Sequence, residues 1–311
     1  MSAVVTHEQL VGGFVAEERS GRAGFLGTLK SEWVKIRSVR STYWTLFALI
    51  VVCVGIGALF SWGQTERLLS LAHGVTLRGQ HLPPGLAKQV LANREAQIRS
   101  NAAAISLFGL LIGQLIIVVL GSLTITSEYS TGMIRTSLSS MPRRCTLFAA
   151  KGIVFGAVAL VTGLVTSFLA FFVGQAILSS QHVNTTLGHS GVLRAVIGGG
   201  LFLAVTGLLS YGVGAMLRHS AGAIAASIGL MFVLTILTNF LPSSGPGEPA
   251  TGWFGQADID KWIPFFAGAH IWQDQMVGIN PFSVWIGFGV FCAYAAAAIA
   301  GGLAVFLRRD A

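Results

Sequence analysis

Long apolar runs alternate with polar stretches along this chain, and the runs are long enough to cross a membrane. A helix rises 1.5 Å per residue, so about 20 residues cross the roughly 30 Å hydrocarbon core of a bilayer. The pattern predicts an all-α integral membrane protein with six transmembrane helices in a single domain. The predicted spans cover about residues 43–62, 102–126, 147–178, 192–216, 221–241 and 282–307.

The chain before the first span divides into two parts. Residues 1–24 are polar without a sustained period, which is typical of a loose tail. The domain then begins at residue 25, where an apolar stripe with helical spacing predicts an amphipathic helix at the membrane interface. The stripe consists of Leu26, Leu29, Trp33 and Ile36, and Lys30, Glu32, Lys35 and Arg37 fall outside it. A plain basic flank of the first span is the alternative.

Two longer polar segments separate spans, at residues 63–101 and 242–281. In the first, Pro83-Pro84 precedes a pattern that predicts a short helix leading into span two. The second is rich in Trp and Phe, which favour the membrane interface. Within it, residues 263–271 are apolar but too short to span, which favours a re-entrant or surface helix.

A polar stretch of different character, residues 127–135, follows span two. It is either a solvated loop or a short surface helix that contacts a partner. Glu128 and Arg135 are seven residues apart and would share one face of a helix. Gly132 between them would let another backbone approach. We expect Glu128 to lie near a helix N-terminus and to accept backbone hydrogen bonds.

Composition supports the membrane class and excludes others. Of the 311 residues, 53% are hydrophobic and only 10% are charged, whereas soluble domains carry about 25% charged residues. The net charge of +8 comes from basic residues that flank the apolar runs. Such flanks indicate topology rather than nucleic-acid binding, and they favour cytoplasmic positions for both termini.

Several kinds of chemistry have no sequence support. The three Cys and seven His show no metal-ligand spacing, so we expect no metal and no cofactor. No phosphate-binding Gly-rich loop followed by Lys-Ser/Thr is present, so the chain should not hydrolyse ATP and should have no catalytic residue. No acidic residue lies deep within a predicted span, which argues against an ion-driven transporter.

One motif resembles a known family. The order Ser-Glu-Tyr-Ser-Thr-Gly-Met-Ile-Arg at 127–135, then Pro142-Arg143-Arg144 and Ala150-Lys151, is similar to the permease subunit of ABC-2 type transporters. The order of spans and the loop sizes from about Leu29 to Arg309 are also similar. The resemblance predicts an exporter in the bacterial plasma membrane.

The resemblance also implies partners and site residues. It implies two copies of an ABC ATP-binding subunit, and a homo- or heterodimer with a second permease subunit in the lipid bilayer, without nucleic acid. Spans one, two and five would form the dimer interface. The implied coupling helix, which contacts the ATPase, contains Glu128, Tyr129, Ser130, Thr131, Gly132, Met133, Ile134 and Arg135. The implied connecting helix contains Leu29, Glu32, Trp33, Lys35 and Arg37.

The spans contain many Gly, Ser and Thr and few charges, which favours an apolar or amphipathic cargo held between two copies. Two alternatives stay open. The chain could be a membrane scaffold or accessory protein that transports nothing. It could also be an enzyme acting on lipid through His182, His189 or His270, although no carboxylate lies at a spacing that supports this.

Overall fold

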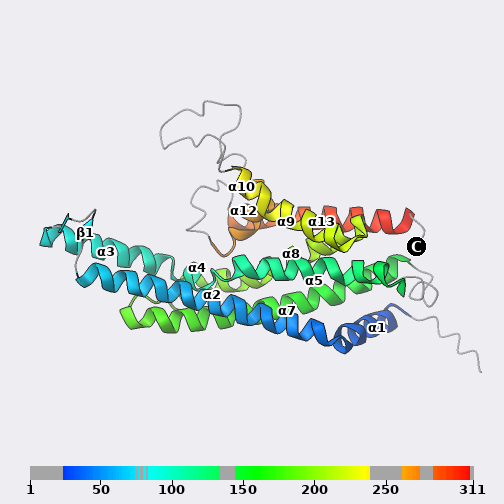
Figure 1. Cartoon of the computed structure of the whole chain (residues 1–311), viewed down its shortest axis with the longest axis horizontal. Helices are drawn as coiled ribbons and strands as arrows, with labels where there is room; N and C mark the ends of the chain where they lie inside the picture. Colours follow the sequence, from blue (N-terminus) through cyan, green and yellow to red (C-terminus); the bar gives the residue numbers. More distant parts are fainter. Residues whose placement is uncertain are drawn as a thin grey trace, which may run out of the picture.

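The computed structural model of the chain describes residues 24–73, 76–77, 80–81, 83–133, 144–238, 261–273 and 283–308. Nearly all of these residues lie in helices aligned along the long axis of the molecule (Figure 1). Among the described residues, six helical segments are long and apolar enough to cross a membrane, which confirms the predicted fold class. These segments are α2 (Arg40–His73), α5 (Leu110–Ser130), α7 (Arg144–Leu178), α8 (Val192–Leu217), Ser220–Leu237 and α13 (Val284–Arg308). The predicted tail, residues 1–24, lies outside the described residues except for Gly24.

The first span, α2, ends at His73 rather than near Trp62, where the prediction placed its end. The additional turns contain polar residues, and for that reason the hydropathy pattern predicted a loop there. They stay helical because Leu68 packs with Ile98 and Val183 in a small second hydrophobic core. A two-stranded hairpin follows, β1 (Thr76–Leu77) and β2 (Gln80–His81), and then the predicted short helix, α3 (Pro84–Ser100).

The predicted second span is divided into α4 (Ala102–Ser106) and α5, with a break at residues 107–109. Gly109 lies directly against the backbone carbonyl of Cys53 in α2, so a Cβ there would overlap the backbone. Gly57 of α2 lies in the same way against the carbonyl of Ser106. Small residues at these points allow α2 to approach α4 and α5 closely, as in other membrane helix pairs.

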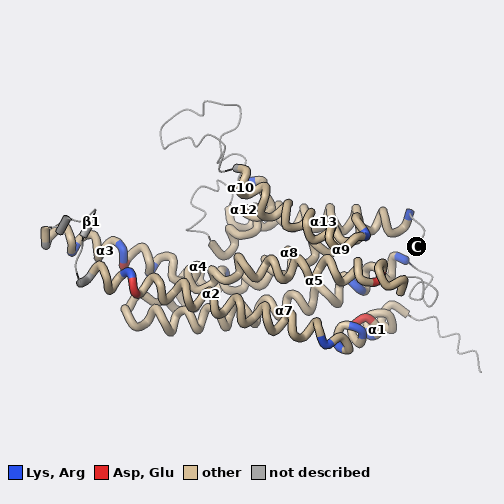
Figure 2. The backbone as a smooth tube through the Cα atoms, viewed as in Figure 1, with Lys and Arg blue, Asp and Glu red and all other residues tan. Residues whose placement is uncertain are grey.

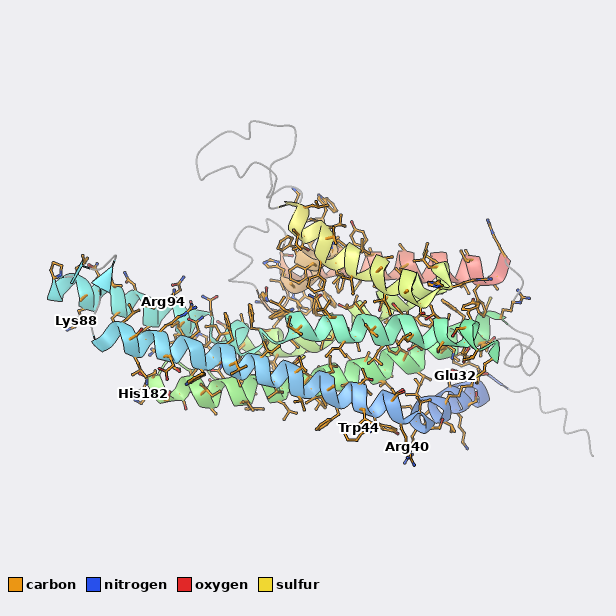
Figure 3. The ribbon with its side chains drawn as sticks, in the orientation of Figure 1. Glu32, Arg40, Trp44, Lys88, Arg94 and His182 are labelled. Atoms are coloured by element: carbon orange, nitrogen blue, oxygen red, sulfur yellow. The ribbon has the colours of Figure 1, made fainter. Side chains whose placement is uncertain are left out.

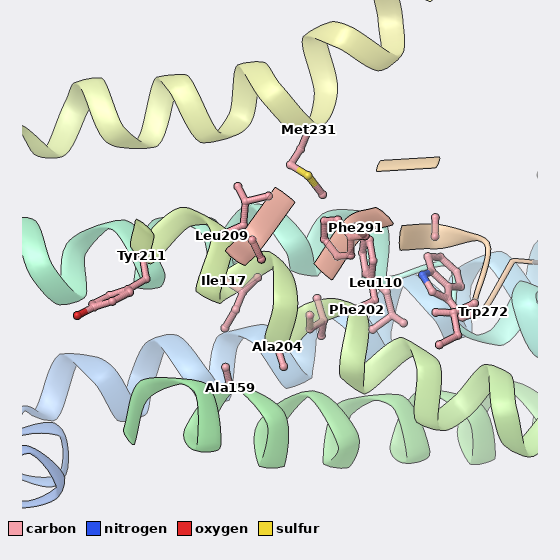
Figure 4. Packing of buried hydrophobic residues seen from close by; sticks show 14 of the residues in the cluster. Leu110, Ile117, Ala159, Phe202, Ala204, Leu209, Tyr211, Met231, Trp272 and Phe291 are labelled. Carbon is pink, nitrogen blue, oxygen red and sulfur yellow. The ribbon is translucent and has the colours of Figure 1, made fainter. Parts of the chain in front are cut away.

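Helix α8 is the centre of the bundle and packs against α5, α7 and α13. It is the most buried of the spans. In the hydrophobic core, Phe202 of α8 contacts the rings of Trp272 and Phe291 (Figure 4). The predicted boundaries of this span, 192–216, agree with the structure to within one residue.

The last part of the described chain covers one side of α8. The fifth span consists of α9 (Ser220–Ile228), a π-helical turn η3 (Gly229–Val233) and α10 (Leu234–Thr238). A short helix, α12 (Pro264–Ala269), forms within the apolar stretch 263–271 and packs against α13 and η3. Most of the aromatic segment that precedes α12 lies outside the described residues.

The two ends of the bundle differ in their helices. One end gathers α1 (Phe25–Ser38), the end of α5, the start of α7 and the ends of α8 and α13 (Figure 1). The opposite end carries the hairpin, α3 and the turn η2 (Ser179–Gln181). Charged residues concentrate at these ends, and the middle of the bundle is almost free of them in the described residues (Figure 2). This distribution fits helices that cross a bilayer.

Candidate functional site

Four charged side chains meet at the α1 end of the bundle. Lys151 Nζ of α7 donates to Glu32 Oε2 of α1 at 2.6 Å and to Glu128 Oε1 of α5 at 2.8 Å. Lys35 Nζ of α1 donates to Glu32 Oε1 at 2.9 Å and to Glu128 Oε1 at 3.3 Å. This ion cluster (Glu32, Lys35, Glu128 and Lys151) therefore connects three helices; Glu32 is labelled in Figure 3.

The ion cluster is largely removed from solvent. Glu32 is 2% exposed, Lys151 6% and Glu128 7%, whereas Lys35 lies at the rim. A buried charge without a partner is costly, and a buried pair persists only with good geometry and satisfied hydrogen bonds. Here two carboxylates face two ammonium groups, so their formal charges cancel. The arrangement can fix how α1, α5 and α7 sit relative to one another.

Two members of the ion cluster lie in α1, outside the spans, and their pKa values follow from their partners. Burial alone would raise the pKa of Glu32, but the attraction of Lys151 and hydrogen bonds from Lys151 and Lys35 outweigh it, so this pKa is lowered. Burial would lower the pKa of Lys35, but hydrogen bonds to both carboxylates and their charges outweigh it, so this pKa is raised. Both side chains are therefore charged at neutral pH.

A second contact joins the ends of α5, α8 and α13 near the ion cluster. The guanidinium Cζ of Arg218 lies 4.9 Å from the ring centroid of Tyr129, in cation–π geometry. Arg218 follows α8 with a left-handed backbone (φ 57°), and its Nη2 donates to the carbonyl of Val305 at 3.2 Å. Earlier in α8, the Tyr211 hydroxyl donates to the Phe148 carbonyl at 2.9 Å.

Helix α1 docks on the bundle through its polar side. Thr28 and Glu32 are buried against the protein, whereas Leu26 is 78% and Trp33 49% exposed. The predicted amphipathic helix forms. Leu26 and Trp33 of its apolar stripe face away from the protein, while Leu29 and Ile36 are partly buried. At a membrane interface, that stripe would contact lipid. The remaining implied connecting-helix residues, Leu29, Lys35 and Arg37, lie on the same helix.

The implied coupling residues fall at the end of a span. Glu128, Tyr129 and Ser130 form the last turn of α5, and Thr131 caps it. Gly132 has a left-handed backbone (φ 70°), and a Cβ added to it would meet no atom within 4 Å. The next residue, Met133, is 48% exposed. Ile134 and Arg135 lie outside the described residues.

The expectation that Glu128 lies near a helix N-terminus is wrong, because this residue is in the C-terminal turn of α5. The negative end of the helix dipole disfavours a carboxylate there. Lys151 and Lys35 supply the compensating charge instead of backbone amides.

Sequence reasoning did not predict the role of Lys151 or of Arg218. Lys151 falls inside a predicted apolar span, where a charged residue almost always has a partner of opposite charge. That signal could have indicated a pairing with Glu128, which ends the preceding span. The contribution of Glu32 has no such signal, since only the fold brings α1 against α7.

An apolar cavity of about 570 Å³ opens between α7, α8 and α13. Its volume is in the range of pockets that hold small organic molecules. Its position near Phe148 and Tyr211 places it in the half of the bundle that contains the ion cluster. It is lined by Cys145, Phe148, Ala149, Gly152, Ile153, Gly156, Ala157, Leu160, Leu201, Ala204, Val205, Leu208, Tyr211, Ile299 and Leu303.

The model of one protein family, described as ABC-2 family transporter protein, matches residues 29–311. The chain belongs to this family. A comparison with curated proteins gives no match. This membership confirms the resemblance seen in the sequence motif. The matched region contains every described helix except for the first turn of α1.

Membership in the ABC-2 family gives the chain its general role. It is the permease of an ABC transporter, a multi-pass membrane subunit rather than a catalytic one, and the family implies partnership with an ABC ATP-binding subunit. The ion cluster of this ABC-2 permease includes Glu128, the first residue of the segment that the family resemblance assigns to contact with the ATPase. That shared residue makes the cluster its candidate functional site.

Proposed function

We propose that this ABC-2 permease exports an apolar or amphipathic compound across the bacterial plasma membrane. Two copies of a separate ATP-binding subunit drive it, and a second permease subunit, identical or different, completes the complex. Both termini lie in the cytoplasm. The observation that carries the proposal is the buried ion cluster, which joins the end of α5 to α1 and α7.

The ion cluster supports a route for motion from the ATPase into the spans. The segment after Ser130 is continuous with the last turn of α5, so a push on that segment moves the end of α5. Glu128 at the end of α5 forms ion pairs with Lys151 of α7 and Lys35 of α1, so movement of this end is transmitted to both helices. A contact of this kind drives transport only if the ATPase holds the segment differently in its two nucleotide states.

The charges at the two ends of the bundle support the orientation. The α1 end carries most of the Lys and Arg residues close to the spans, including four that directly precede the first span, and such residues favour the cytoplasmic side. The opposite end also carries basic residues, so the bias rests on those around α1. The described basic residues at the α1 end are Lys30, Lys35, Arg37, Arg40, Arg144, Lys151, Arg218 and Arg308.

The apolar cavity supports a cargo with an apolar part. It lies on the α7, α8 and α13 side of one subunit, whereas the family resemblance assigns the dimer interface to the first, second and fifth spans. On that assignment the cavity would be separate from the space between two copies, where the composition of the spans predicts the cargo to be held. It offers an apolar compound a place within a single permease.

Gly132 provides the test of coupling. Its left-handed backbone is available to Gly and tolerated by Asn but strained for a β-branched residue. We expect Gly132→Val to reduce cargo-stimulated ATP hydrolysis of the purified complex several-fold, and Gly132→Asn to retain most of it. Gly27→Val on α1, where the added side chain also meets open space, is the matched control for an exposed bulky residue.

Membrane abundance of each variant is measured first, so that loss of assembly is separated from loss of coupling. Normal abundance with equal stimulated hydrolysis in Gly132→Val and Gly132→Asn would remove the coupling assignment. If no ATP-binding subunit co-purifies with the wild-type chain under any condition, the result favours the alternative that the chain is a membrane scaffold or accessory protein.

A further inference from the structure

The end of the bundle opposite α1 contains a polar cavity of about 100 Å³. Arg99 contributes to it from the end of α3, Arg194 from the first turn of α8 and His189 from the loop that precedes α8. None of the described residues that line it is Asp or Glu, so its local charge is positive. The lining residues are Arg99, Ser100, Asn101, Ala103, Ala104, Thr185, His189, Ser190, Gly191, Val192, Arg194, Ala195 and Trp272.

The N-terminus of α8 adds to this positive field. Gly191 is the N-cap residue of α8 and has a left-handed backbone (φ 83°). Because it is a glycine, it has no side chain that could accept a hydrogen bond from the first turn of the helix. The helix is 26 residues long, and its first amide groups carry the positive end of the helix dipole. Helix N-termini of this kind bind phosphate and other anions.

The cavity is held in shape by hydrogen bonds around its rim. Arg99 Nη2 donates to the His182 carbonyl at 2.8 Å, which positions its guanidinium. Gln175 of α7 is 7% exposed; its Nε2 donates to the Ala102 carbonyl at 2.9 Å, and its Oε1 accepts from the Thr185 amide at 2.7 Å. Gln175 thereby fixes both α4 and the loop before α8, which contribute to the cavity wall.

An aromatic side chain also lines the cavity. Trp272 lines the cavity and is 1% exposed, and its indole N–H has no acceptor among the described residues. Buried polar groups normally have partners. The strongest donors of the wall are the guanidinium groups of Arg99 and Arg194.

We propose that this cavity binds one phosphate group. Its volume is too small for a drug-sized molecule but holds several waters or one small anion. Arg side chains recognise phosphate through paired N–H donors. Arg194 is in the first turn of a span, so the site lies at the depth of lipid headgroups. The phosphate can therefore belong to a phospholipid or to a soluble anion.

The test uses the full-length chain and has two arms. In the first, inorganic phosphate is titrated into lipid-depleted protein in a neutral detergent, and the thermal midpoint is compared with chloride at equal ionic strength. In the second, phosphatidylglycerol is added to the same protein, and the retained lipid is counted by native mass spectrometry. Arg194→Gln should weaken binding by about tenfold or more in the arm that responds, because a charge-assisted hydrogen bond is lost.

Two further variants make the result specific. Arg94 lies at the same end of the bundle but does not line the cavity, so Arg94→Gln should bind phosphate or lipid like the wild type. Arg194→Lys keeps the charge without the paired donors, so it should fold and bind with intermediate strength. A response to inorganic phosphate identifies a soluble anion, and a response to phosphatidylglycerol alone identifies a lipid. No response in either arm, or equal losses in Arg194→Gln and Arg94→Gln, would overturn the proposal.

Discussion

Replacing Lys151 by Met removes the ammonium that joins both buried carboxylates of the ion cluster. The variant keeps Glu32 and Glu128, which are 2% and 7% exposed, with only the rim residue Lys35 of the cluster to neutralise them. Breaking a buried ion pair by removing one partner costs about 3–5 kcal/mol. Because α1 owes its position to these pairs, we expect most of that cost to appear as undocking of α1. A cost of about 3 kcal/mol raises the undocked fraction by about a hundredfold.

The assay reports undocking directly. Thr28 lies on the docked face of α1 and is 2% exposed, so Thr28→Cys is shielded from a thiol reagent while α1 is docked. The native Cys53, Cys145 and Cys292 are replaced first. In this background Lys151→Met should greatly accelerate labelling. Lys30→Met, which removes an exposed ammonium from the same helix, should leave the rate unchanged.

A compensating variant separates charge from packing. Glu32→Gln combined with Lys151→Met leaves Lys35 opposite Glu128, so the cluster again has no net charge. We expect this double variant to label more slowly than Lys151→Met alone. If Lys151→Met labels no faster than Lys30→Met, the ion cluster does not hold α1, and the reasoning about coupling through it fails.

Three other measurements test the structure. The thermal midpoint of unfolding should stay level around neutral pH. The lowered pKa of Glu32 gives stability that is lost only as pH falls below about 4.5, and the raised pKa of Lys35 gives stability that is lost only above about 10.5. A decline of the midpoint between pH 6 and 8 would refute this. Gly57→Ala should destabilise by about 1–3 kcal/mol because its methyl group meets the Ser106 backbone, whereas Gly55→Ala on the same helix should be nearly neutral, and equal midpoints would contradict the close approach. Cysteine at Lys30, an exposed position outside the apolar stripe of α1, should react with an impermeant thiol reagent only in opened cells, and reaction in intact cells would reverse the orientation.

The spans are well predicted from the sequence because their signal is local. Hydropathy over about 20 residues does not depend on which helix packs on which, and α8 and α13 begin and end within two residues of their predicted bounds. The prediction fails where tertiary contacts override composition. The end of α2 remains helical because Leu68 has a partner in α3, and the second span divides where Gly109 meets α2.

The candidate site could be predicted only in part. The family resemblance predicts that Glu128 and the residues after it contact a partner, but the pattern cannot show that Lys35 and Lys151 converge on the Glu128 carboxylate. Those contacts join residues 93 and 23 positions apart in the chain. Their pairing depends on how α1 folds back against α7. The apolar stripe of α1 predicts that its other face is polar, but it does not show which helix that polar face packs against.

The central position of α8 has a consequence for biosynthesis. Ribosomes deliver the first three spans to the membrane before α8 exists, and α5 and α7 each contact α8 far more extensively than they contact each other. Until Val192–Leu217 has been inserted, the faces of α5 and α7 that will receive its glycines have only lipid or the insertion machinery beside them. Helix α2 can already pack against α7 and α5 at that stage, but α5 and α7 have little contact with each other until the fourth span lies between them.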